Sequence, residues 1–555
     1  MDEVLLVMCG GALLYGLARA QSRLQLSLAK HRSLAGHPRM ARRIANLLPN
    51  YQYDEAAALA VDGAPADVAA RRKAALDHLT VEFQKRYAKS AAMSADMEGS
   101  ISDMRFVSAY RVPYQFRRLL GDRLKFGSFV QSTSGVTVTD LDGNQYYDLT
   151  GSYGVNLFGN DFYKECIAEG SELVKDLGPV LGAYHPVVAD NVRRLRQISG
   201  MDEVSFHMSG TEAVMQAVRL ARYHTRRTHL VRFCGAYHGW WGDVQPGIGN
   251  PSRARETYTL KDMDEATLRV LRTRRDIACV LVNPLQALHP NRNAPGDTAL
   301  TDSSRSAGYD RVAYTLWLRE LRDICYQRGI ALIFDEVFVG FRLAPGGAQE
   351  YFGIQADLVT YGKTLGGGLP VGVLCGKSAW MQRFREDAPV DICFARGTFN
   401  SHPYVMGAMN AFLRRVDSDP VRKLCRGQDE IWNRRAHTLN LRLQEAGVPV
   451  AVANMSSIWT VLYTQPGCYN WLFQFYLRLH GLALSWVGSG RLIFSLNYSE
   501  AEFDVVAQRF VAAALVMQRD GWWWQDAKLT NKTIRRRMLL EMLFHRFGHQ
   551  ERITH

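Results

Sequence analysis

The sequence is poor in cysteine, and its few cysteines follow no pattern. Nine of the 555 residues are cysteine, scattered and odd in number, and no two of them form a Cys-x-x-Cys pair. This distribution argues against a zinc ribbon and a disulfide framework, and it favours a reducing compartment. Zinc-finger patterns, RNA-binding aromatic motifs and internal repeats are also missing. The net charge of +13 is therefore not interpreted as nucleic-acid binding.

The start of the chain has no apolar run as long as the ~20 residues that a helix needs to cross a bilayer. Val4–Ala18 is apolar apart from small residues and Tyr15, and seven arginines and lysines follow between positions 19 and 43. A basic leading segment and a convincing cleavage site are absent, so this is not a predicted secretory signal. Two interpretations stay open for residues 1–30. They are a membrane anchor whose positive flank keeps the protein at the cytoplasmic face, or a helix that is buried or packed on a partner.

The far end, residues 521–555, is basic and partly apolar. It begins with Trp522–Trp524, and from Lys528 onward seven lysines and arginines stand against two glutamates. Interleaved apolar residues predict a basic amphipathic helix, which either lies on an anionic membrane surface or packs on the rest of the protein. His545 and His549 have helical spacing but no evident third ligand beyond Glu541, so no metal site is predicted.

Composition and length otherwise indicate a large globular protein. With 47% hydrophobic residues, the 555-residue chain is long enough for two or three domains with a substantial core. Within it, Ala331–Phe334 and Leu358–Tyr361 are uninterrupted apolar runs, which is typical of parallel strands buried on both faces. Asp335 follows the first run and Lys363 stands just after the second, so both are predicted at the carboxyl edge of an open α/β sheet.

An amine and a carboxylate at that edge are suited to one kind of cofactor chemistry. The Lys363 amine can form an imine with an aldehyde, and the Asp335 carboxylate can keep a heteroaromatic nitrogen protonated. Pyridoxal phosphate (PLP) needs both partners to act as an electron sink. Together the two residues suggest PLP chemistry, with Lys363 and Asp335 as the catalytic pair.

A phosphate site and a ring platform are predicted from two further motifs. Ser209, Gly210 and Thr211 precede apolar residues at helical spacing, so their backbone would grip a phosphate at a helix start, although an ordinary helix cap would look the same. Tyr237 lies in a glycine-flanked turn and is suited to stacking on a flat cofactor. Arg396–Phe399 is another small-residue turn that carries a hydroxyl, that of Thr398.

Taken together, these motifs resemble the class III aminotransferases of fold type I, and most of all the glutamate-1-semialdehyde aminomutase branch. The similarity runs from about residue 127 to 502, and five blocks occur in the family's order. They are Ser209–Ala213, Tyr237–Gly239, Phe334–Val337 with Gly340–Arg342, Gly362–Lys363 with Gly366–Gly372, and Gly397–Phe399.

The resemblance implies an α/β fold with a large, mostly parallel-sheet domain and a smaller α+β domain. It implies that Tyr237 stacks on the PLP ring, that Asp335 pairs with the ring nitrogen and that Lys363 carries the imine. Val337 would pack beneath the ring, and Gln286 would neighbour its phenolic oxygen. It also implies a homodimer in which Thr398 reaches the phosphate held by the other subunit.

Two departures from the family pattern bear on the substrate. Asn283-Pro284 stands where the family has Glu-Pro, and Ala287-Leu288-His289 replaces a Gly-Glu-Gly that often follows the glutamine. The glutamate that pairs with a mobile arginine in many ω-aminotransferases is thereby lost. No arginine aligns cleanly with the one that binds the substrate carboxylate in the aminomutase.

Three functional classes follow. The first is a PLP-dependent aminotransferase associated with a membrane, which uses an amino donor and a lipidic, acyl or carrier-bound carbonyl substrate. The second is an aminomutase that moves an amine within one small molecule. The third is a non-catalytic scaffold, against which the intact Lys363 and Asp335 argue.

The predicted organisation has five parts. Residues 1–30 form the anchor or packed helix, and 31–126 a helical extension. Residues 127–415 form the large PLP-binding domain with a hairpin at Thr137–Tyr147 that turns at Asp142-Gly143. Residues 416–520 form the small domain, whose last helix starts at the capping box Ser499-x-x-Glu502. Residues 521–555 form the basic amphipathic tail.

Overall fold

The computed structural model describes residues 2–245, 248–250, 254–288, 301–485 and 490–547. The chain divides into two compact units, each assembled from three stretches. The first unit comprises Met1–Ala45, Val174–Ala294 and Asp310–Asn410, and the second comprises Asn46–Leu173, Pro295–Tyr309 and Ala411–His555. This division differs from the five parts predicted from the sequence. Those five parts stay a prediction.

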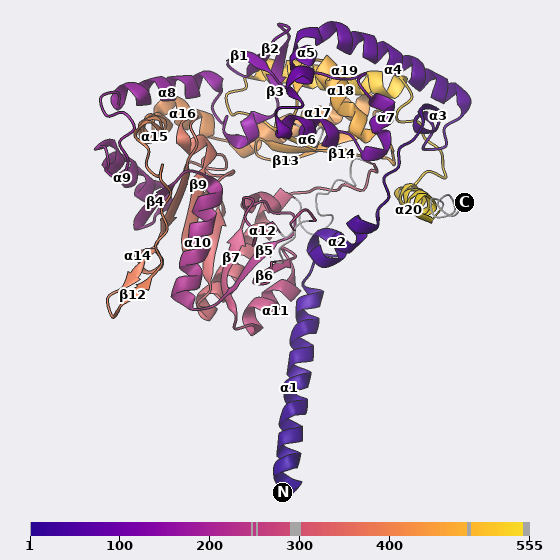
Figure 1. Cartoon of the computed structure of the whole chain (residues 1–555). Coiled ribbons are helices and arrows are strands. Elements are labelled where there is room, and N and C mark those ends of the chain that lie inside the picture. The colour runs from indigo at the N-terminus through magenta and orange to yellow at the C-terminus, as the bar shows by residue number, and fades with distance from the viewer. Residues whose placement is uncertain (1, 246–247, 251–253, 289–300, 486–489, 548–555) are drawn as a thin grey trace. The chain divides into compact units, whose positions relative to one another are not determined.

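The first unit is built on a seven-stranded, mostly parallel sheet (Figure 1). Its strand order is β4-β10-β9-β8-β7-β5-β6, and only β10 runs antiparallel to its neighbours. The strands are β4 (Glu203–His207), β5 (His229–Phe233), β6 (Thr257–Leu260), β7 (Ile277–Val282), β8 (Ala331–Asp335), β9 (Leu358–Gly362) and β10 (Gly372–Gly376).

The two strands predicted from apolar runs are confirmed. All residues of β8 and β9 are buried, as a strand covered on both faces requires. The two strands pair in parallel, with Asp335 opposite Thr360. Their carboxyl ends therefore lie side by side, and the expected α/β fold class holds.

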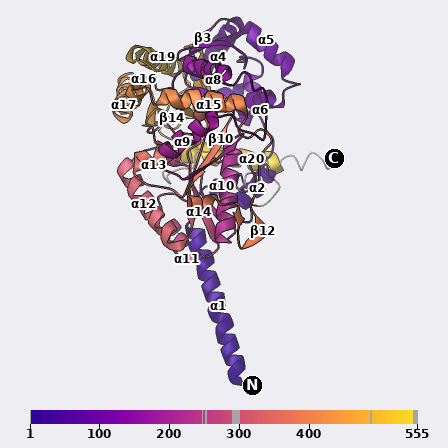
Figure 2. The same cartoon turned by 90° about the vertical axis from the view of Figure 1, so that its left-hand side faces the viewer.

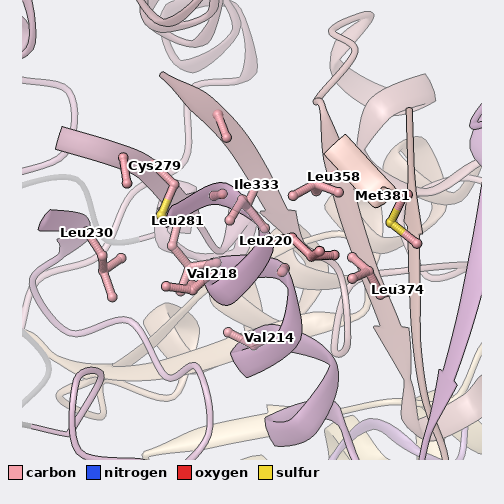
Figure 3. Packing of buried hydrophobic residues seen from close by; sticks show 14 of the residues in the cluster. Val214, Val218, Leu220, Leu230, Cys279, Leu281, Ile333, Leu358, Leu374 and Met381 are labelled. Carbon is pink, nitrogen blue, oxygen red and sulfur yellow. The ribbon is translucent and has the colours of Figure 1, made fainter. Parts of the chain in front are cut away.

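One face of this sheet packs against the helix α10 (Gly210–Thr225), as Figure 3 shows. Val214, Val218 and Leu220 of the helix meet side chains such as Leu281 and Ile333 that alternate along the strands. Fully burying one such aliphatic side chain contributes about 1.5–3 kcal/mol relative to leaving it exposed. This packing fixes the helix, and with it the position of the helix N-terminus.

The remaining elements of the first unit connect the strands or precede the sheet. They are α1 (Asp2–Leu28), η1 (Leu34–Gly36), α2 (Pro38–Leu47), α9 (Val187–Ser199), α11 (Glu265–Thr273), η4 (Pro284–Leu288), α12 (Arg311–Arg328), α13 (Gly347–Phe352), η6 (Lys363–Gly366), α14 (Ser378–Met381), β11 (Phe384–Arg385), β12 (Ala388–Ile392) and α15 (Pro403–Val416). The last residues of α2 and of α15 belong to the second unit.

The helix α1 is one unbroken helix of 27 residues (Figures 1 and 2). Its last turns are tied to the first unit, because Ser22 Oγ accepts a hydrogen bond from Arg274 and Gln25 Oε1 accepts one from Thr273. Farther towards the N-terminus the apolar side chains are exposed, with Leu13 at 66% and Leu14 at 69%. Among the described residues, no helix has the length and apolarity that a membrane crossing requires.

The second unit combines helices with two small sheets. One sheet has the order β1-β2-β3-β15, and the other, antiparallel, has the order β13-β14-β16. The strands are β1 (Val130–Ser134), β2 (Thr137–Asp140), β3 (Gln145–Asp148), β13 (Val450–Met455), β14 (Ile458–Tyr463), β15 (Leu482–Ala483) and β16 (Arg491–Ile493). The helices are α3 (Glu55–Leu59), α4 (Ala66–Arg86), α5 (Ala88–Met97), α6 (Ser102–Tyr110), η2 (Tyr114–Phe116), α7 (Arg117–Leu120), η3 (Gly151–Gly154), α8 (Asn160–Leu173), α16 (Asp419–Cys425), α17 (Gln428–Glu445), η7 (Asn470–Leu472), α18 (Phe473–Leu479), α19 (Glu500–Arg519) and α20 (Asn531–Phe547).

Three local predictions are confirmed in this unit. The hairpin is β2 paired with β3, and Gly143 at its turn has a φ of +82°, a conformation that glycine adopts readily. The capping box at the start of α19 is complete, since Ser499 and Glu502 exchange hydrogen bonds. The predicted tail helix is α20.

Candidate active site

The predicted site residues follow strands at the carboxyl edge of the seven-stranded sheet. Asp335 ends β8, Lys363 follows β9, Gln286 follows β7 and Tyr237 follows β5. These four strands are parallel neighbours, so their carboxyl ends share one edge. The structure therefore brings the predicted amine, carboxylate and aromatic ring to the same side of the sheet.

Asp335 is only 3% exposed, and both of its carboxylate oxygens are held. One oxygen, Oδ2, lies 2.8 Å from Nδ1 of His238. The other, Oδ1, accepts a hydrogen bond from the backbone N–H of Val337 at 3.2 Å and from the Thr360 hydroxyl at 3.3 Å. A buried carboxylate held by three donors has a fixed position and retains lone pairs for one further donor.

His238 is a residue of the candidate site that the sequence analysis did not assign a role, although it lies within the block Tyr237–Gly239. It is fully buried beside Asp335, and burial lowers the pKa of its ring although the carboxylate opposes this. A ring that donates from Nδ1 to Asp335 leaves Nε2 as an acceptor, and Nε2 has no hydrogen-bond partner in the part of the chain that the structure describes. The signal in the sequence is its place directly after Tyr237.

Lys363 stands in a strained backbone conformation. Its φ is +49°, in the left-handed region that non-glycine residues rarely adopt. The half-buried side chain places Nζ 4.8 Å from the centre of the Phe338 ring. Strain of this kind is typical of functional positions, where the surrounding structure imposes it.

The start of α10 has the form that the sequence predicts. Ser209 is the N-cap, and its hydroxyl oxygen accepts a hydrogen bond from the Glu212 N–H at 3.3 Å. The Glu212 carboxylate accepts one in return from the Met208 N–H at 3.0 Å. The N–H groups of Gly210 and Thr211 stand at the first turn, where helices bind anions. Phosphate binding by these residues stays a prediction.

Glycines allow the predicted motifs to touch one another. A Cβ atom at Gly210 would lie 2.6 Å from Cγ1 of Val337, and one at Gly239 would lie 2.5 Å from the Thr211 hydroxyl. Such distances are too short for a real Cβ, so only glycine fits at either place without a shift. The start of α10, the turn that carries Tyr237, and Val337 are therefore packed against each other.

Tyr237 and Gln286 are arranged differently from one another. The Tyr237 side chain is 58% exposed, and its backbone carbonyl accepts a hydrogen bond from the Asn283 amide at 3.2 Å. Gln286 is 7% exposed, and its side-chain amide makes no hydrogen bond with a described residue. The aromatic ring is thus accessible for stacking, and the Gln286 amide is available to a ligand.

Thr398 is the one predicted residue that the structure does not join to the others. It is exposed in the turn after β12 and makes no hydrogen bond with a described residue. Its neighbour Gly397 lies near the Glu212 carboxylate at the start of α10. Its predicted role toward a second subunit stays a prediction.

Metal-ligating side chains do not cluster in the described residues. No group of three or more histidine, cysteine, aspartate or glutamate side chains there is placed to hold an ion. Of the histidine pair weighed from the sequence, His549 lies outside the described residues, as does His289 of the altered family motif.

The residues present fit PLP. A held carboxylate at Asp335, an amine at Lys363, an accessible ring at Tyr237 and a helix N-terminus at Gly210 supply one partner for each polar part of the cofactor. The close approach of Gly210 to Val337 leaves the helix start without a side chain that would block it. All five residues belong to the first compact unit.

Comparison with known proteins agrees with this geometry. The glutamate-1-semialdehyde 2,1-aminomutase of Alkaliphilus oremlandii is 33% identical over 309 residues, which are 53% of this chain and 67% of the relative. That of a Hydrogenobaculum species is 31% identical over 348 residues, 60% and 76% of the two chains.

Solved structures show the same fold. A glutamate-1-semialdehyde aminomutase from Pseudomonas aeruginosa superposes with a TM-score of 0.64 at 18% identity, over 80% of this chain and 98% of that one. A transaminase solved with PLP bound gives 0.60 at 25% identity, over 76% and 99%. The family model for class III aminotransferases matches residues 122–513. The chain therefore belongs to the class III aminotransferases and is a PLP-dependent enzyme of fold type I.

Proposed function

We propose that this enzyme transfers an amino group between two separate molecules, an amino donor and a carbonyl substrate with a large apolar part such as a lipidic, acyl or carrier-bound carbonyl. The observation that carries the transferase chemistry is the pairing of Lys363 with Asp335 at the ends of adjacent strands, with Asp335 held by His238. The same two residues argue against a non-catalytic scaffold.

The residues have separate tasks in such a transfer. When bound, PLP stabilises negative charge that develops on the substrate carbon. Lys363 supplies the amine that removes a proton from that carbon and returns one to the neighbouring position. Asp335 keeps a negative charge beside the ring nitrogen, and the bonds from His238, Val337 and Thr360 prevent it from turning away.

The substrate class is inferred from the residues around Gln286. Asn283 replaces a family glutamate, and its amide holds the Tyr237 carbonyl and the Leu285 N–H instead of facing a substrate charge. Ala287 and Leu288, which stand in place of the family's Gly-Glu-Gly, are 1% and 0% exposed, so these two positions present no carboxylate to a substrate. Beside Tyr237, Trp240 is 75% exposed. These features support a substrate with an apolar part.

The second candidate is an intramolecular amino transfer, as in the aminomutases that the chain resembles at 31–33% identity. The transaminase and the aminomutase differ in whether they need a separate amino donor and in how much carbonyl product each site releases. Purified enzyme with bound cofactor is mixed with one amine at a time, and the cofactor absorbance and the carbonyl product are measured. A transaminase converts the cofactor and releases one carbonyl product per site. An aminomutase isomerises glutamate-1-semialdehyde without an added donor, and that result would overturn the proposal.

Two lysine variants test the assignment of the amine. Lys363→Ala should lose at least about a hundredfold in rate, the lower end of what a proton-transfer group contributes, and should lose the absorbance of lysine-bound cofactor. Lys377→Ala is the matched control. Lys377 follows β10, which ends at the opposite edge of the sheet, and its amine bonds the Gly200 carbonyl. Unchanged turnover in Lys363→Ala would refute the mechanism.

We also propose that α1 attaches the enzyme to an anionic membrane surface. Its exposed apolar side chains are followed by seven arginines and lysines, and no acidic residue occurs between positions 4 and 53. Each cation near an anionic leaflet adds about 1 kcal/mol of attraction. Leu14→Asp should abolish sedimentation with phosphatidylserine vesicles, whereas Val81→Asp on the exposed face of α4 should not. Equal sedimentation of both variants would contradict this role.

We further propose a homodimer in which Thr398 of one copy faces the cofactor phosphate of the other. The exposed turn and its unused hydroxyl support this. A mixture of Thr398→Ala and Lys363→Ala chains should form hybrid dimers in which both defects fall on one site, leaving the other site with a normal rate. No recovered activity after subunit exchange would count against the arrangement.

A further inference from the structure

A pocket lies in the second compact unit, lined by residues that mostly fall before or after the part of the chain matched by the family model. We call it the tail pocket. It has a volume of about 530 Å³ and is lined by residues 53, 61–63, 115–116, 301, 468, 524, 526, 528–529, 533–534 and 537–538. Only Thr301 and Cys468 fall within residues 122–513. Ligand pockets commonly enclose 300–1,000 Å³, so this volume suits a small molecule.

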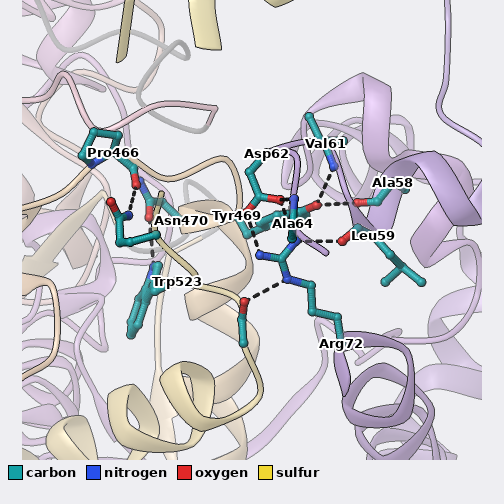
Figure 4. A network of polar contacts seen from close by, with 12 residues as sticks. Ala58, Leu59, Val61, Asp62, Ala64, Arg72, Pro466, Tyr469, Asn470 and Trp523 are labelled. Carbon is teal, nitrogen blue, oxygen red and sulfur yellow. Dashed lines mark hydrogen bonds and ion pairs between the residues drawn. The ribbon is translucent and has the colours of Figure 1, made fainter. Parts of the chain in front are cut away.

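One wall of the tail pocket is held by a buried ion pair (Figure 4). Arg72 donates to Asp62 at 2.8 and 2.6 Å, to the Leu59 carbonyl at 2.7 Å and to the Gly521 carbonyl at 2.8 Å. Tyr469 lies under the Arg72 guanidinium, and its hydroxyl donates to the Ala58 carbonyl and accepts from the Val61 N–H. The loop from Ala58 to Gly63 is therefore fixed before any ligand arrives.

Another part of the lining is α20, which is joined to the same unit at its start and in its second half. Near its start, the Asn531 side chain accepts from the Ser303 N–H at 2.9 Å, and Arg535 lies 2.7 Å from Asp302. In its second half, Glu541 accepts from the Tyr53 hydroxyl at 2.6 Å. These contacts hold the helix against the residues that line the pocket. In the structure the tail therefore packs on the rest of its own unit, which is one of the two alternatives predicted from the sequence.

The lining combines apolar side chains, some of them buried, with polar and charged ones. Phe116 and Ile534 are 2% and 5% exposed, and Tyr53, Trp524 and Met538 add to the apolar surface. Lys528 is an exposed member of the lining. Such a lining suits an amphiphilic ligand, whose apolar chain lies against the apolar residues and whose charged head group lies beside the exposed lysine.

The sign of the head group follows from which charges are already paired. Arg72 occupies both oxygens of Asp62, and Asp526 accepts a hydrogen bond from the Lys528 backbone N–H. The Lys528 ammonium makes no hydrogen bond with a described residue. Arg537 donates through Nε to Glu541 and through Nη1 to the Val61 carbonyl, and its Nη2 has no partner among the described residues. The Lys528 ammonium and the Nη2 of Arg537, whose charge is already paired with Glu541, thus remain as donors for an anion, and they stand beside the Asp526 carboxylate in the lining.

We propose that the tail pocket binds a small anionic amphiphile, whose apolar chain lies among Tyr53, Phe116, Trp524, Ile534 and Met538 and whose carboxylate is held by Lys528 and Arg537. The tail pocket shares no residue with those assigned to amino transfer, and the proposal does not depend on the proposed substrate.

The test is a calorimetric titration of the full-length holoenzyme with dodecanoate as the probe. The probe is kept below its critical micelle concentration. One saturable site is expected. Lys528→Gln should weaken binding about tenfold, the value of one charge-assisted hydrogen bond. Lys532→Gln removes an exposed lysine of α20, four positions after Lys528, that does not line the pocket, and it should leave binding unchanged. Leu529→Trp fills the pocket and should abolish binding, whereas Leu540→Trp on the exposed face of α20 should not.

Three results would overturn the proposal. The first is the absence of saturable binding, and the second is tighter binding of dodecylammonium than of dodecanoate. The third is equal weakening by Lys528→Gln and Lys532→Gln. Lys363→Ala serves as a further check, because its loss of dodecanoate binding would place the probe in the active site instead. Circular dichroism of each variant shows that it is folded.

Discussion

At the carboxyl edge of the seven-stranded sheet each functional side chain directly follows a strand, whereas the tail pocket is made by segments that meet only after the chain has folded. Asp335 and Lys363 are positioned by two adjacent parallel strands. Tyr53 and Glu541, which close the tail pocket, are 488 positions apart in the chain. The first kind of site depends on local order and sheet register, and the second depends on a few long-range polar contacts. Variants can separate the two.

The largest effect is expected from breaking the buried ion pair beside the tail pocket. Arg72→Met leaves the Asp62 carboxylate buried without its partner, which costs about 3–5 kcal/mol of stability. Denaturant unfolding measures the loss, and the cofactor absorbance of the folded protein should stay unchanged. Arg71→Met is the control, since Arg71 and Asp67 form an exposed pair that contributes at most about 1 kcal/mol. Equal losses in the two variants would contradict the comparison.

The converse change at the sheet edge should affect chemistry and leave stability nearly unchanged. Asp335→Asn keeps an oxygen that can accept from the Val337 N–H and removes the negative charge. Loss of one preorganised electrostatic partner lowers rates about a hundredfold or more. Steady-state kinetics with saturating cofactor, beside a melting curve, check the prediction. A normal rate would mean that the carboxylate is only structural.

Overpacking the helix start should weaken cofactor binding. Gly210→Ala brings a methyl group against Val337, which lies 2.6 Å from the position of the new Cβ, and overpacking of this kind costs about 1–3 kcal/mol. The expected result is a higher dissociation constant for PLP, measured by fluorescence titration. Val337→Ala in the same chain should restore much of the affinity. If the second substitution gives no recovery, the contact is not what limits binding.

The last effect appears only when the pH changes, and it concerns Glu336, the residue after Asp335. Burial first of all raises its pKa to about 8, and the nearby Asp335 adds to the rise. An acid whose folded pKa is raised binds a proton more readily in the native state, so stability falls as pH rises from about 4.5 towards 8. The slope is at most ~1.4 kcal/mol per pH unit.

Glu336→Gln should therefore gain stability relative to the parent as pH increases. Its side-chain oxygen can still accept the hydrogen bond of the Ala348 N–H. Melting temperatures at pH 6 and pH 9 check this, with the exposed Glu445→Gln as the control. A pH-independent difference between Glu336→Gln and the parent would show that Glu336 is ionised throughout.

Much of the sheet edge can be predicted from sequence because its information is local. The apolar runs before Asp335 and Lys363 predict buried strands, and Ser209 followed by Glu212 predicts a helix cap. His238 could not be placed in the same way. The sequence around His238 does not predict a hydrogen bond to a carboxylate 97 positions later. That contact arises only because β5, β7 and β8 are neighbours in the sheet.

The tail pocket could not be predicted for a related reason. The periodicity of residues 531–547 predicts a helix, and it does not say what the helix covers. The partners of that helix, Asp302 and Tyr53, lie in irregular segments that are far from it in the sequence. Only the three-dimensional arrangement reveals a pocket there.

The left-handed backbone conformation of Lys363 lowers the stability of the fold at the position whose amine the reaction requires. A non-glycine residue in this conformation costs the fold about 1–3 kcal/mol, and glycine would remove most of that cost. Random selection for heat resistance would therefore favour Lys363→Gly, a change that destroys the amine. Engineering of this enzyme for robustness should hold that codon fixed and look for gains elsewhere, because the most strained residue in the turn after β9 is the one that the reaction needs.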